Sequence, residues 1–303
     1  MEIAVDGEER PSYDKDIEYE YAPSNYIKLS EGVTPEEALD AYIQEWHKIS
    51  KRAREELDVE LNVPYAPTSD RTRIDFYRSK SEQLSENPPV YMYVHGGYWE
   101  MCSKEEHGLV SYPAVSAGAV SAVIDYDLLP TVTLDEIVAQ TKEALQFIAK
   151  KFPNSRLYLG GHSAGAHLVA MMMTIHDWAN PKFLDRIKGV CLMAGIYDLQ
   201  PLLPIRVLHD RNITRTIAIR NSPDVILRTH PPSFRCPVKL IIGEHEPPSF
   251  HKQTRDFMQV LDSQHVSTCF HELSGMDHFS AVSAYADQTS LVFKEIQRMI
   301  LEK

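Results

Sequence analysis

The sequence predicts one α/β domain spanning residues 1–303, with a mostly parallel sheet, helices on both faces and a small cap-like insertion. Three features support this prediction: apolar runs of strand length, amphipathic helical segments between them, and one proline-rich stretch that interrupts the alternation. Parallel strands are apolar at nearly every position because crossover helices cover both faces of their sheet. The composition, with 43% hydrophobic and 24% charged residues over a length of 303, suits a globular protein with a sizeable core.

Residues 1–60 are expected to form an N-terminal extension that is polar at first and then helical. The segment "TPEEALDAYIQEWHKISKRAREEL" starts with Thr34 as the N-cap, Pro35 at the first helical position and Glu37 at the third. This pattern is a capping box, which marks the start of a helix. Two short edge strands are expected after this helix, in "NVPYAP" and "RIDFYRS".

Strands and helices alternate along the rest of the chain. Strands are predicted within 88–94, 116–126, 156–161, 187–198, 236–246 and 267–275. Helices are predicted at 133–152, 163–178 and 287–300, and in the segment that ends in "QVLDS". Residues 199–235 contain five prolines and no strand pattern, and an insertion of this length in a compact domain is usually functional. We expect a cap or pocket wall there, with an inert surface excursion as the alternative.

Charge and motif content exclude several functional classes. The net charge of −12 disfavours nucleic acid and membrane surfaces as partners, because both present negative charge. No run approaches the roughly 18 apolar residues of a membrane span, and the acidic N-terminal segment lacks the apolar core of a signal peptide. There is no C-x-x-C pair and no G-x-G-x-x-G, and His162 and His167 lie on different helix faces. We therefore expect a cytoplasmic protein without a metal or cofactor.

The segment "LYLGGHSAGAHL" contains a G-x-S-x-G motif centred on Ser163. The motif follows an apolar strand and opens an apolar helix, which is the strand–turn–helix setting of a nucleophilic serine. Such a turn holds the serine in a strained backbone conformation, so the flanking positions must lack side-chain bulk. Backbone amides at the helix N-terminus favour the negative charge that develops nearby. The alternative is an ordinary serine N-cap.

A nucleophilic serine needs a base, and the α/β-hydrolase fold supplies its partners in the chain order serine, acid, histidine. "ELSGMDHFS" places His278 just beyond the last predicted strand. "VKLIIGEHEPPSF" places Glu246 on the turn that leaves a strand, and it is our choice for the acid, with Glu244 as the rival. Asp198, which also follows a strand, is a weaker rival. In this template Ser163 attacks a carbonyl, the histidine accepts its proton, and the acid orients the imidazole.

The segment "VHGGYWE" follows an apolar strand that precedes the nucleophile in the chain. Attack on a carbonyl creates an oxyanion, which preorganised backbone N–H groups stabilise. One donor in this fold is the residue after the nucleophile, here Ala164, and another comes from an HGGG-type loop in the position of this segment. We expect Gly97 and Tyr98 to donate, with Gly96 as the alternative. His95 is expected to anchor the loop rather than to act as a base.

Five motifs together resemble the kynurenine formamidases, also called arylformamidases. These motifs are "HGGYW", "GHSAGAHL", "GIYDL", "GEHEPPSFHKQ" and "MDHF", and the resemblance runs from about residue 21 to the C-terminal helix. It implies an α/β-hydrolase fold, hydrolysis of N-formyl-L-kynurenine to L-kynurenine and formate in tryptophan catabolism, and a cytosolic homodimer. In two respects the chain departs from the pattern: family members often carry aspartate at the position of Glu246, and Tyr98 replaces the third glycine of HGGG.

Two aromatic residues follow the oxyanion glycines and are candidate substrate-binding residues. Tyr98 and Trp99 are expected to form an aromatic wall for the ring of an aryl formamide, with packing of the loop against the core as the alternative for Trp99. Nothing in the sequence identifies the residues that bind the amino-acid end of such a substrate, and the insertion at 199–235 is the expected source. Two other functions stay open: a general carboxylesterase, and a non-catalytic binding module with a hydrolase fold.

Overall fold

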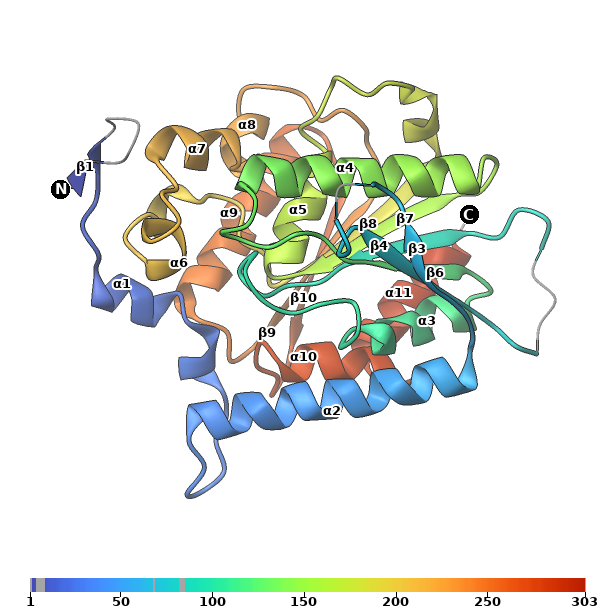
Figure 1. The fold of residues 1–303 in the computed structure, drawn as a ribbon, viewed down its shortest axis with the longest axis horizontal. Coiled ribbons are helices and arrows are strands. Elements are labelled where there is room, and N and C mark those ends of the chain that lie inside the picture. The colour runs from blue at the N-terminus through green and yellow to red at the C-terminus, as the bar shows by residue number, and fades with distance from the viewer. Residues whose placement is uncertain (1, 4–8, 68, 82–84, 303) are drawn as a thin grey trace.

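A central sheet lies between two layers of helices (Figure 1). The structure is a computed structural model that describes residues 2–3, 9–67, 69–81 and 85–302. It confirms the predicted α/β-hydrolase fold, with a mostly parallel sheet and helices on both faces. Residues 1 and 4–8 of the predicted N-terminal extension lie outside the described residues.

The main sheet has eight strands within the described part of the chain, in the order β10-β9-β8-β7-β5-β6-β4-β3. These strands are β3 (Asp58–Pro64), β4 (Arg73–Arg78), β5 (Val90–Val94), β6 (Val120–Ile124), β7 (Leu157–His162), β8 (Ile187–Met193), β9 (Val238–Gly243) and β10 (Thr268–Leu273). β4 pairs antiparallel with β3 and β6, and the other pairings in the sheet are parallel. The carboxyl ends of the parallel strands therefore meet at one edge. A separate antiparallel pair joins β1 (Glu2–Ile3) to β2 (Glu9–Arg10).

Helices cover both faces of the sheet, which is why the central strands β5, β6 and β7 are buried along their whole length. One face carries α4 (Leu134–Lys151), α5 (Ala164–Met172) and α9 (Pro248–Ser263). The other carries α3 (Ser111–Ser116), α10 (Ser280–Ser283) and α11 (Leu291–Leu301), with α2 (Pro35–Glu56) packed over α10.

The predicted capping box at the start of α2 is confirmed. The Thr34 hydroxyl accepts a hydrogen bond from the Glu37 N–H, and the Glu37 carboxylate accepts one from the Thr34 N–H. Thr133 and Glu136 form the same reciprocal pair at the start of α4. Each box satisfies two backbone donors that would otherwise lack partners.

Three predicted element boundaries are wrong. The helix predicted at 287–300 starts at Leu291, because the Ser290 hydroxyl caps it by accepting a hydrogen bond from the Phe293 N–H. The first edge strand, β3, starts at Asp58 and not at Asn62, because a register shift between Glu60 and Val63 lets the strand continue through Asn62 at a φ of 58°. The helix predicted at 163–178 ends at Met172. The carbonyl of Met173 accepts a hydrogen bond from the Ser233 N–H at 2.7 Å, so the chain turns away there.

The insertion at 199–235 folds into short helices, α6 (Arg206–His209), α7 (Arg215–Arg220) and α8 (Pro223–Leu227). It lies beside α1 (Lys15–Glu20) of the N-terminal extension (Figure 1). The Glu18 carboxylate accepts a hydrogen bond from the Arg206 N–H at 2.7 Å, and Asp14 N–H donates to the Pro204 carbonyl at 3.0 Å. Extension and insertion, far apart in sequence, therefore pack against each other.

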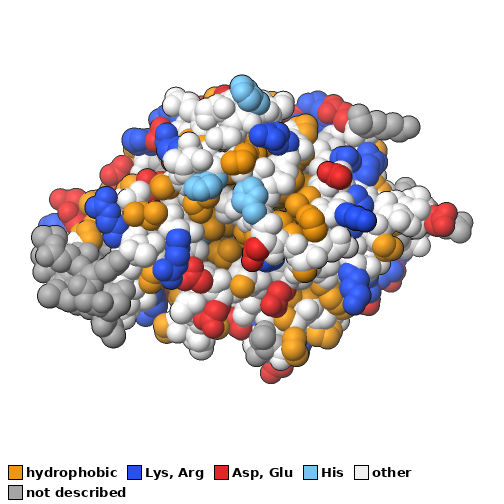
Figure 2. Space-filling model, turned by 90° about the horizontal axis from the view of Figure 1, so that it is seen from above, with side chains coloured by type: hydrophobic (Ala, Val, Ile, Leu, Met, Phe, Trp, Pro, Cys, Tyr) orange, Lys and Arg blue, Asp and Glu red, His pale blue; other side chains and the backbone are white. Residues whose placement is uncertain are grey.

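Acidic, basic and hydrophobic side chains are mixed on the face shown in Figure 2. The net charge of −12 therefore does not produce a patch of a single sign on that face. Among the described helices, none is both long and apolar enough to cross a bilayer.

Helix α5 packs so closely on the end of β5 that Gly165 has no space for a side chain. A Cβ atom on Gly165 would lie 2.0 Å from the Val94 carbonyl oxygen and 2.5 Å from that of His95, and backbone atoms cannot rotate away. We expect Gly165→Ala to lower the free energy of unfolding by about 3 kcal/mol or more, measured by urea denaturation. Gly189→Ala is the control, because its Cβ would meet the flexible Met299 side chain at 2.7 Å. Equal losses for the two variants would contradict the explanation.

Candidate active site

Ser163 stands on a sharp turn between β7 and α5. Its backbone angles, φ 56° and ψ −123°, are unfavourable for a residue with a side chain, so the turn stores strain. The turn closes only because its flanking glycines are bare: a Cβ on Gly161 would lie 2.5 Å from the Gly165 backbone. The G-x-S-x-G motif predicted this need for small neighbours, and the contacts confirm it.

His278 and Glu246 meet beside this turn, although the chain separates them by a helix and a strand. The Nδ1 atom of His278 lies 2.9 Å from both carboxylate oxygens of Glu246. Both residues are 4% exposed, so little water competes for this contact. Glu246 lies on the turn after β9 and His278 on the loop after β10, and β9 and β10 are neighbouring parallel strands. Their loops leave the sheet at the same edge.

The two rival acids face elsewhere. Glu244 is exposed, and its carboxylate accepts hydrogen bonds from the Gly275 N–H at 2.6 Å and the Ser274 hydroxyl at 3.0 Å. The hydrogen bond from Gly275 holds the pKa of Glu244 below its usual range. Asp198 accepts a hydrogen bond from the Gln200 N–H at 3.0 Å. Of the three candidates in the described structure, Glu246 alone contacts His278.

The loop that carries His278 is shaped by its neighbour, Asp277. One carboxylate oxygen of Asp277 accepts hydrogen bonds from the N–H groups of Phe279 at 3.0 Å and Ser280 at 2.8 Å. The other accepts one from the Tyr42 hydroxyl of α2 at 3.1 Å. Burial, together with this carboxylate, raises the pKa of Tyr42 to about 12. The N-terminal extension therefore helps to hold the histidine loop.

The segment that follows β5 turns its backbone toward Ser163. Three successive residues have positive φ angles: Gly97 at 104°, Tyr98 at 49° and Trp99 at 60°. Gly96 approaches the serine so closely that a Cβ on it would lie 3.0 Å from the Ser163 Cβ. Within the described part of the chain, no group accepts a hydrogen bond from the backbone N–H of Gly97, Tyr98 or Ala164. These donors are free to bind a ligand oxygen.

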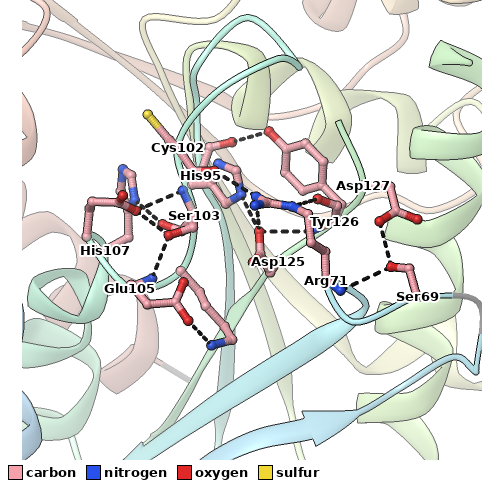
Figure 3. A network of polar contacts seen from close by, with 12 residues as sticks. Ser69, Arg71, His95, Cys102, Ser103, Glu105, His107, Asp125, Tyr126 and Asp127 are labelled. Atoms are coloured by element: carbon pink, nitrogen blue, oxygen red, sulfur yellow. Dashed lines mark hydrogen bonds and ion pairs between the residues drawn. The ribbon is translucent and has the colours of Figure 1, made fainter. Parts of the chain in front are cut away.

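His95 anchors this loop, as the sequence analysis predicted. Its Nδ1 lies 2.8 Å from the Gly96 carbonyl oxygen. Its Nε2 lies 3.0 Å from the Asp125 carboxylate (Figure 3). Its ring stacks on Tyr126, with the ring centroids 4.3 Å apart. Arg71 joins the network by donating to Asp125 at 2.7 Å and to the Cys102 carbonyl at 2.7 Å. Both ends of the 95–102 loop are thereby tied to one buried carboxylate.

Trp99 does not form the aromatic wall that was predicted for it. Its side chain is fully buried and lies outside the residues that line the cavity at Ser163. Its Nε1–H donates to the Nδ1 atom of His167 at 3.2 Å, and the Nε2 atom of His167 lies 2.7 Å from the Asn221 carbonyl oxygen. Trp99 therefore packs the loop against α5, which was the alternative interpretation, because its large ring fits the core and its N–H finds a partner there.

A cavity of about 260 Å³ opens in front of Ser163 and His278. Tyr98 lines it, along with Gly96 and Gly97. The remaining lining residues are Glu18, Tyr21, Ala22, Pro23, Ser24, Leu39, Ile43, Trp46, Glu100, Met101, Cys102, His107, His162, Ile205, Val207 and Phe279. The lining is mostly apolar, which is typical of a site for an aromatic small molecule.

The N-terminal extension, for which no functional role was predicted, supplies the largest single share of the cavity wall. Segment 18–24 and α2 of the N-terminal extension supply eight lining residues, whereas the expected source, the insertion at 199–235, supplies Ile205 and Val207. The Tyr98 hydroxyl donates to the Tyr21 carbonyl and so joins the extension to the oxyanion loop. The apolar stripe of α2 was a sequence signal for this packing, but it could not identify the partner surface.

His162 also lines the cavity, a position that the sequence did not predict. Its Nε2 atom is buried and has no hydrogen-bond partner among the described residues, and its ring centroid lies 4.3 Å from that of His278. Burial, and then the neighbouring His278, lower the pKa of His162 well below its usual value. A neutral ring therefore lies against His278. Within the described residues, no group of three or more His, Cys, Asp or Glu side chains is arranged to hold a metal ion.

The fold and this site define an α/β-hydrolase. Residues 91–281 match a family model described as the alpha/beta hydrolase fold, so the chain belongs to that family. It is also similar to a solved structure described as a thioesterase from Silicibacter sp., with a TM-score of 0.78, 27% identity, and coverage of 93% of this chain and 98% of the other.

Two relatives place the chain more narrowly. A kynurenine formamidase from Danio rerio is 32% identical over 287 residues, which cover 94% of this chain and 96% of the relative. A kynurenine formamidase from Salmo salar is 30% identical over 275 residues, with coverage of 90% and 91%. The chain belongs to the kynurenine formamidase family, as its motifs predicted.

The buried His167 should make stability depend on pH. Burial lowers its pKa to about 4, against about 6.5 in an unfolded chain. Between these pH values the unfolded chain binds more protons than the folded one, so the free energy of unfolding falls as pH decreases from about 6.5 to about 4. One such histidine contributes at most about 1.4 kcal/mol per pH unit.

We expect His167→Gln to be less stable near neutral pH and to lose less stability on acidification. Urea denaturation at several pH values between 4 and 7 measures the slope. His230→Gln, a change at an exposed histidine, controls for the substitution itself. A slope in His167→Gln equal to that of the unmodified protein would contradict the assignment.

Proposed function

We propose that this chain hydrolyses N-formyl-L-kynurenine to L-kynurenine and formate by a Ser163–His278–Glu246 triad. The observation that carries the proposal is a single apolar cavity that is lined by both Ser163, on its strained turn, and His278, whose Nδ1 is held 2.9 Å from Glu246. Membership of the kynurenine formamidase family supports the choice of substrate.

In the first step the Ser163 hydroxyl attacks the formyl carbon while His278 accepts its proton. Glu246 holds the imidazole through Nδ1 and stabilises the imidazolium that forms, so that Nε2 is free to face the serine. Its two oxygens are equidistant from Nδ1, and this shared contact lets the longer glutamate replace the aspartate that is common in the family.

The tetrahedral intermediate carries a negative oxygen, which the N–H groups of Gly97, Tyr98 and Ala164 are proposed to bind. Two properties support this assignment: these donors have no partner within the described residues, and the anchored loop holds them in place. Losing one such donor typically costs roughly 3 kcal/mol of transition-state stabilisation. Gly96, whose position against Ser163 leaves no room for a side chain, is the alternative donor.

Collapse of the intermediate expels the aniline nitrogen of kynurenine, which takes the proton from His278. Water then enters, His278 removes its proton, and formate leaves the serine by the same steps in reverse. The kynurenine ring is proposed to pack against apolar side chains such as Ile43, Trp46 and Val207, all of which line the cavity. Tyr98, in the loop after β5, also lines the cavity.

Substitutions in the triad should separate the roles of its three residues. We expect Ser163→Ala and His278→Ala each to lower kcat by about 10⁴-fold or more, and Glu246→Ala by about 10³-fold, because the imidazole loses its orientation and its counter-charge. Glu244→Ala is the matched control, since this neighbouring glutamate binds the Gly275 loop instead. Steady-state kinetics on N-formyl-L-kynurenine measure the effects, and a larger loss in Glu244→Ala than in Glu246→Ala would reassign the acid.

Substrate choice is tested by comparing kcat/KM for N-formyl-L-kynurenine with that for short aryl esters. We expect the formamide to be preferred, because a short aryl ester lacks the amino-acid side chain and leaves part of the cavity empty. Turnover of esters without turnover of the formamide would favour a general carboxylesterase. A folded protein that a fluorophosphonate fails to label at Ser163 would favour a non-catalytic binding module.

The family resemblance also predicts a cytoplasmic enzyme that forms a homodimer. These two points stay predictions, and size-exclusion chromatography with light scattering would measure the oligomeric state.

A further inference from the structure

One ion pair has a member in the mostly apolar lining of the cavity. Glu100 lines the cavity, and its carboxylate lies 3.0 Å from the Nη2 atom of Arg211, in the insertion. The two side chains are 22% and 31% exposed, so the pair is largely shielded from water. The other lining carboxylate, Glu18, is already bound to the backbone N–H of Arg206. Glu100 is therefore the carboxylate best placed to receive a cationic group from a ligand.

Arg211 has hydrogen-bonding capacity that Glu100 does not use. Its contact with Glu100 runs through Nη2, while its Nε atom is buried and has no partner within the described residues. An arginine binds a carboxylate best through two parallel N–H groups. Arg211 is not itself a lining residue; its guanidinium adjoins the cavity through its direct contact with Glu100.

The position of the pair matches the shape of the proposed substrate. The Glu100 N–H donates to the Gly97 carbonyl at 3.0 Å, which closes a turn over residues 97–100. The Cα atoms at the two ends of such a turn lie within about 7 Å. Glu100 is thus one turn away from the proposed oxyanion donors. In N-formyl-L-kynurenine, the amino-acid head is joined through a methylene and a carbonyl to the ring carbon next to the formamide, so it lies at a similar short range from the reacting carbon.

We propose that the Glu100–Arg211 pair is the subsite for the α-amino-acid head of the substrate, with Glu100 receiving the ammonium group and Arg211 the carboxylate. The inference rests on the proposed function, because the formamide must lie at Ser163 for the head to reach the pair. The ammonium and carboxylate groups of an amino acid are attached to the same carbon atom. They can therefore meet an adjacent carboxylate and guanidinium at once, while the ring stays among apolar side chains.

The test compares N-formyl-L-kynurenine with 2′-formamidoacetophenone, which has the same aryl formamide and lacks the amino-acid head. We expect Glu100→Gln and Arg211→Gln each to lower kcat/KM for N-formyl-L-kynurenine by about 10- to 100-fold, the range for a lost hydrogen bond to a charged group. Activity on 2′-formamidoacetophenone should change little. Arg228→Gln is the matched control, because Arg228 pairs with Asp224, which does not line the cavity, whereas Arg211 pairs with the lining residue Glu100.

Equal losses on both substrates would overturn the subsite, since the pair would then only shape the loop. Unchanged activity on N-formyl-L-kynurenine would overturn it as well.

A binding measurement separates this inference from the proposed function. Calorimetry on Ser163→Ala compares L-kynurenine with 2′-aminoacetophenone, with and without Glu100→Gln. A preference for L-kynurenine that depends on Glu100 supports the subsite even if the unmodified enzyme does not turn over the formamide. Turnover of the formamide without this preference supports the proposed function and overturns the subsite.

Discussion

The contact between helix α5 and the backbone that leaves β5 is the constraint on which the rest of the site depends. Gly165 lets the helix touch the carbonyl oxygens of Val94 and His95, and a single methyl group would not fit there. This contact fixes the strained turn at Ser163 and brings the glycine loop against it. The nucleophile and the free N–H groups are therefore placed by the same packing contact.

Buried polar side chains then hold the loop in its unusual conformation. Positive φ angles are costly for Tyr98 and Trp99, so contacts with neighbouring groups must hold the loop in this conformation. His95 ties its start to Asp125, and Trp99 ties its middle to His167. Both histidines come from the sequence motifs that also carry the glycines and the nucleophile. The motifs are long because they encode this support as well as the chemistry.

The histidine loop shows where prediction from sequence succeeds and where it fails. Its position after the last strand followed from the chain order that the fold imposes, and the structure places His278 beside Glu246 as that order implies. The choice between Glu244 and Glu246 was open, because both lie on one turn. Burial distinguishes them: the Glu244 carboxylate is exposed and binds the Gly275 N–H, whereas Glu246 is buried and contacts the histidine. Tyr42 helps to hold this loop by donating to Asp277, which lies more than 200 positions away in the chain. No local pattern of residues predicts that contact.

The sequence by itself determined the fold class, the order of the strands and helices, the capped start of α2, and the serine turn with its glycines. Each of these depends on local geometry: hydrophobic period, capping chemistry or the space for a side chain. Only the tertiary structure decided what surrounds the serine. In it, Trp99 lies in the core, the N-terminal extension lines the cavity, and Glu100 contacts Arg211. These contacts link segments that are distant in the chain, and such pairings depend on how the layers pack together rather than on any local pattern of residues.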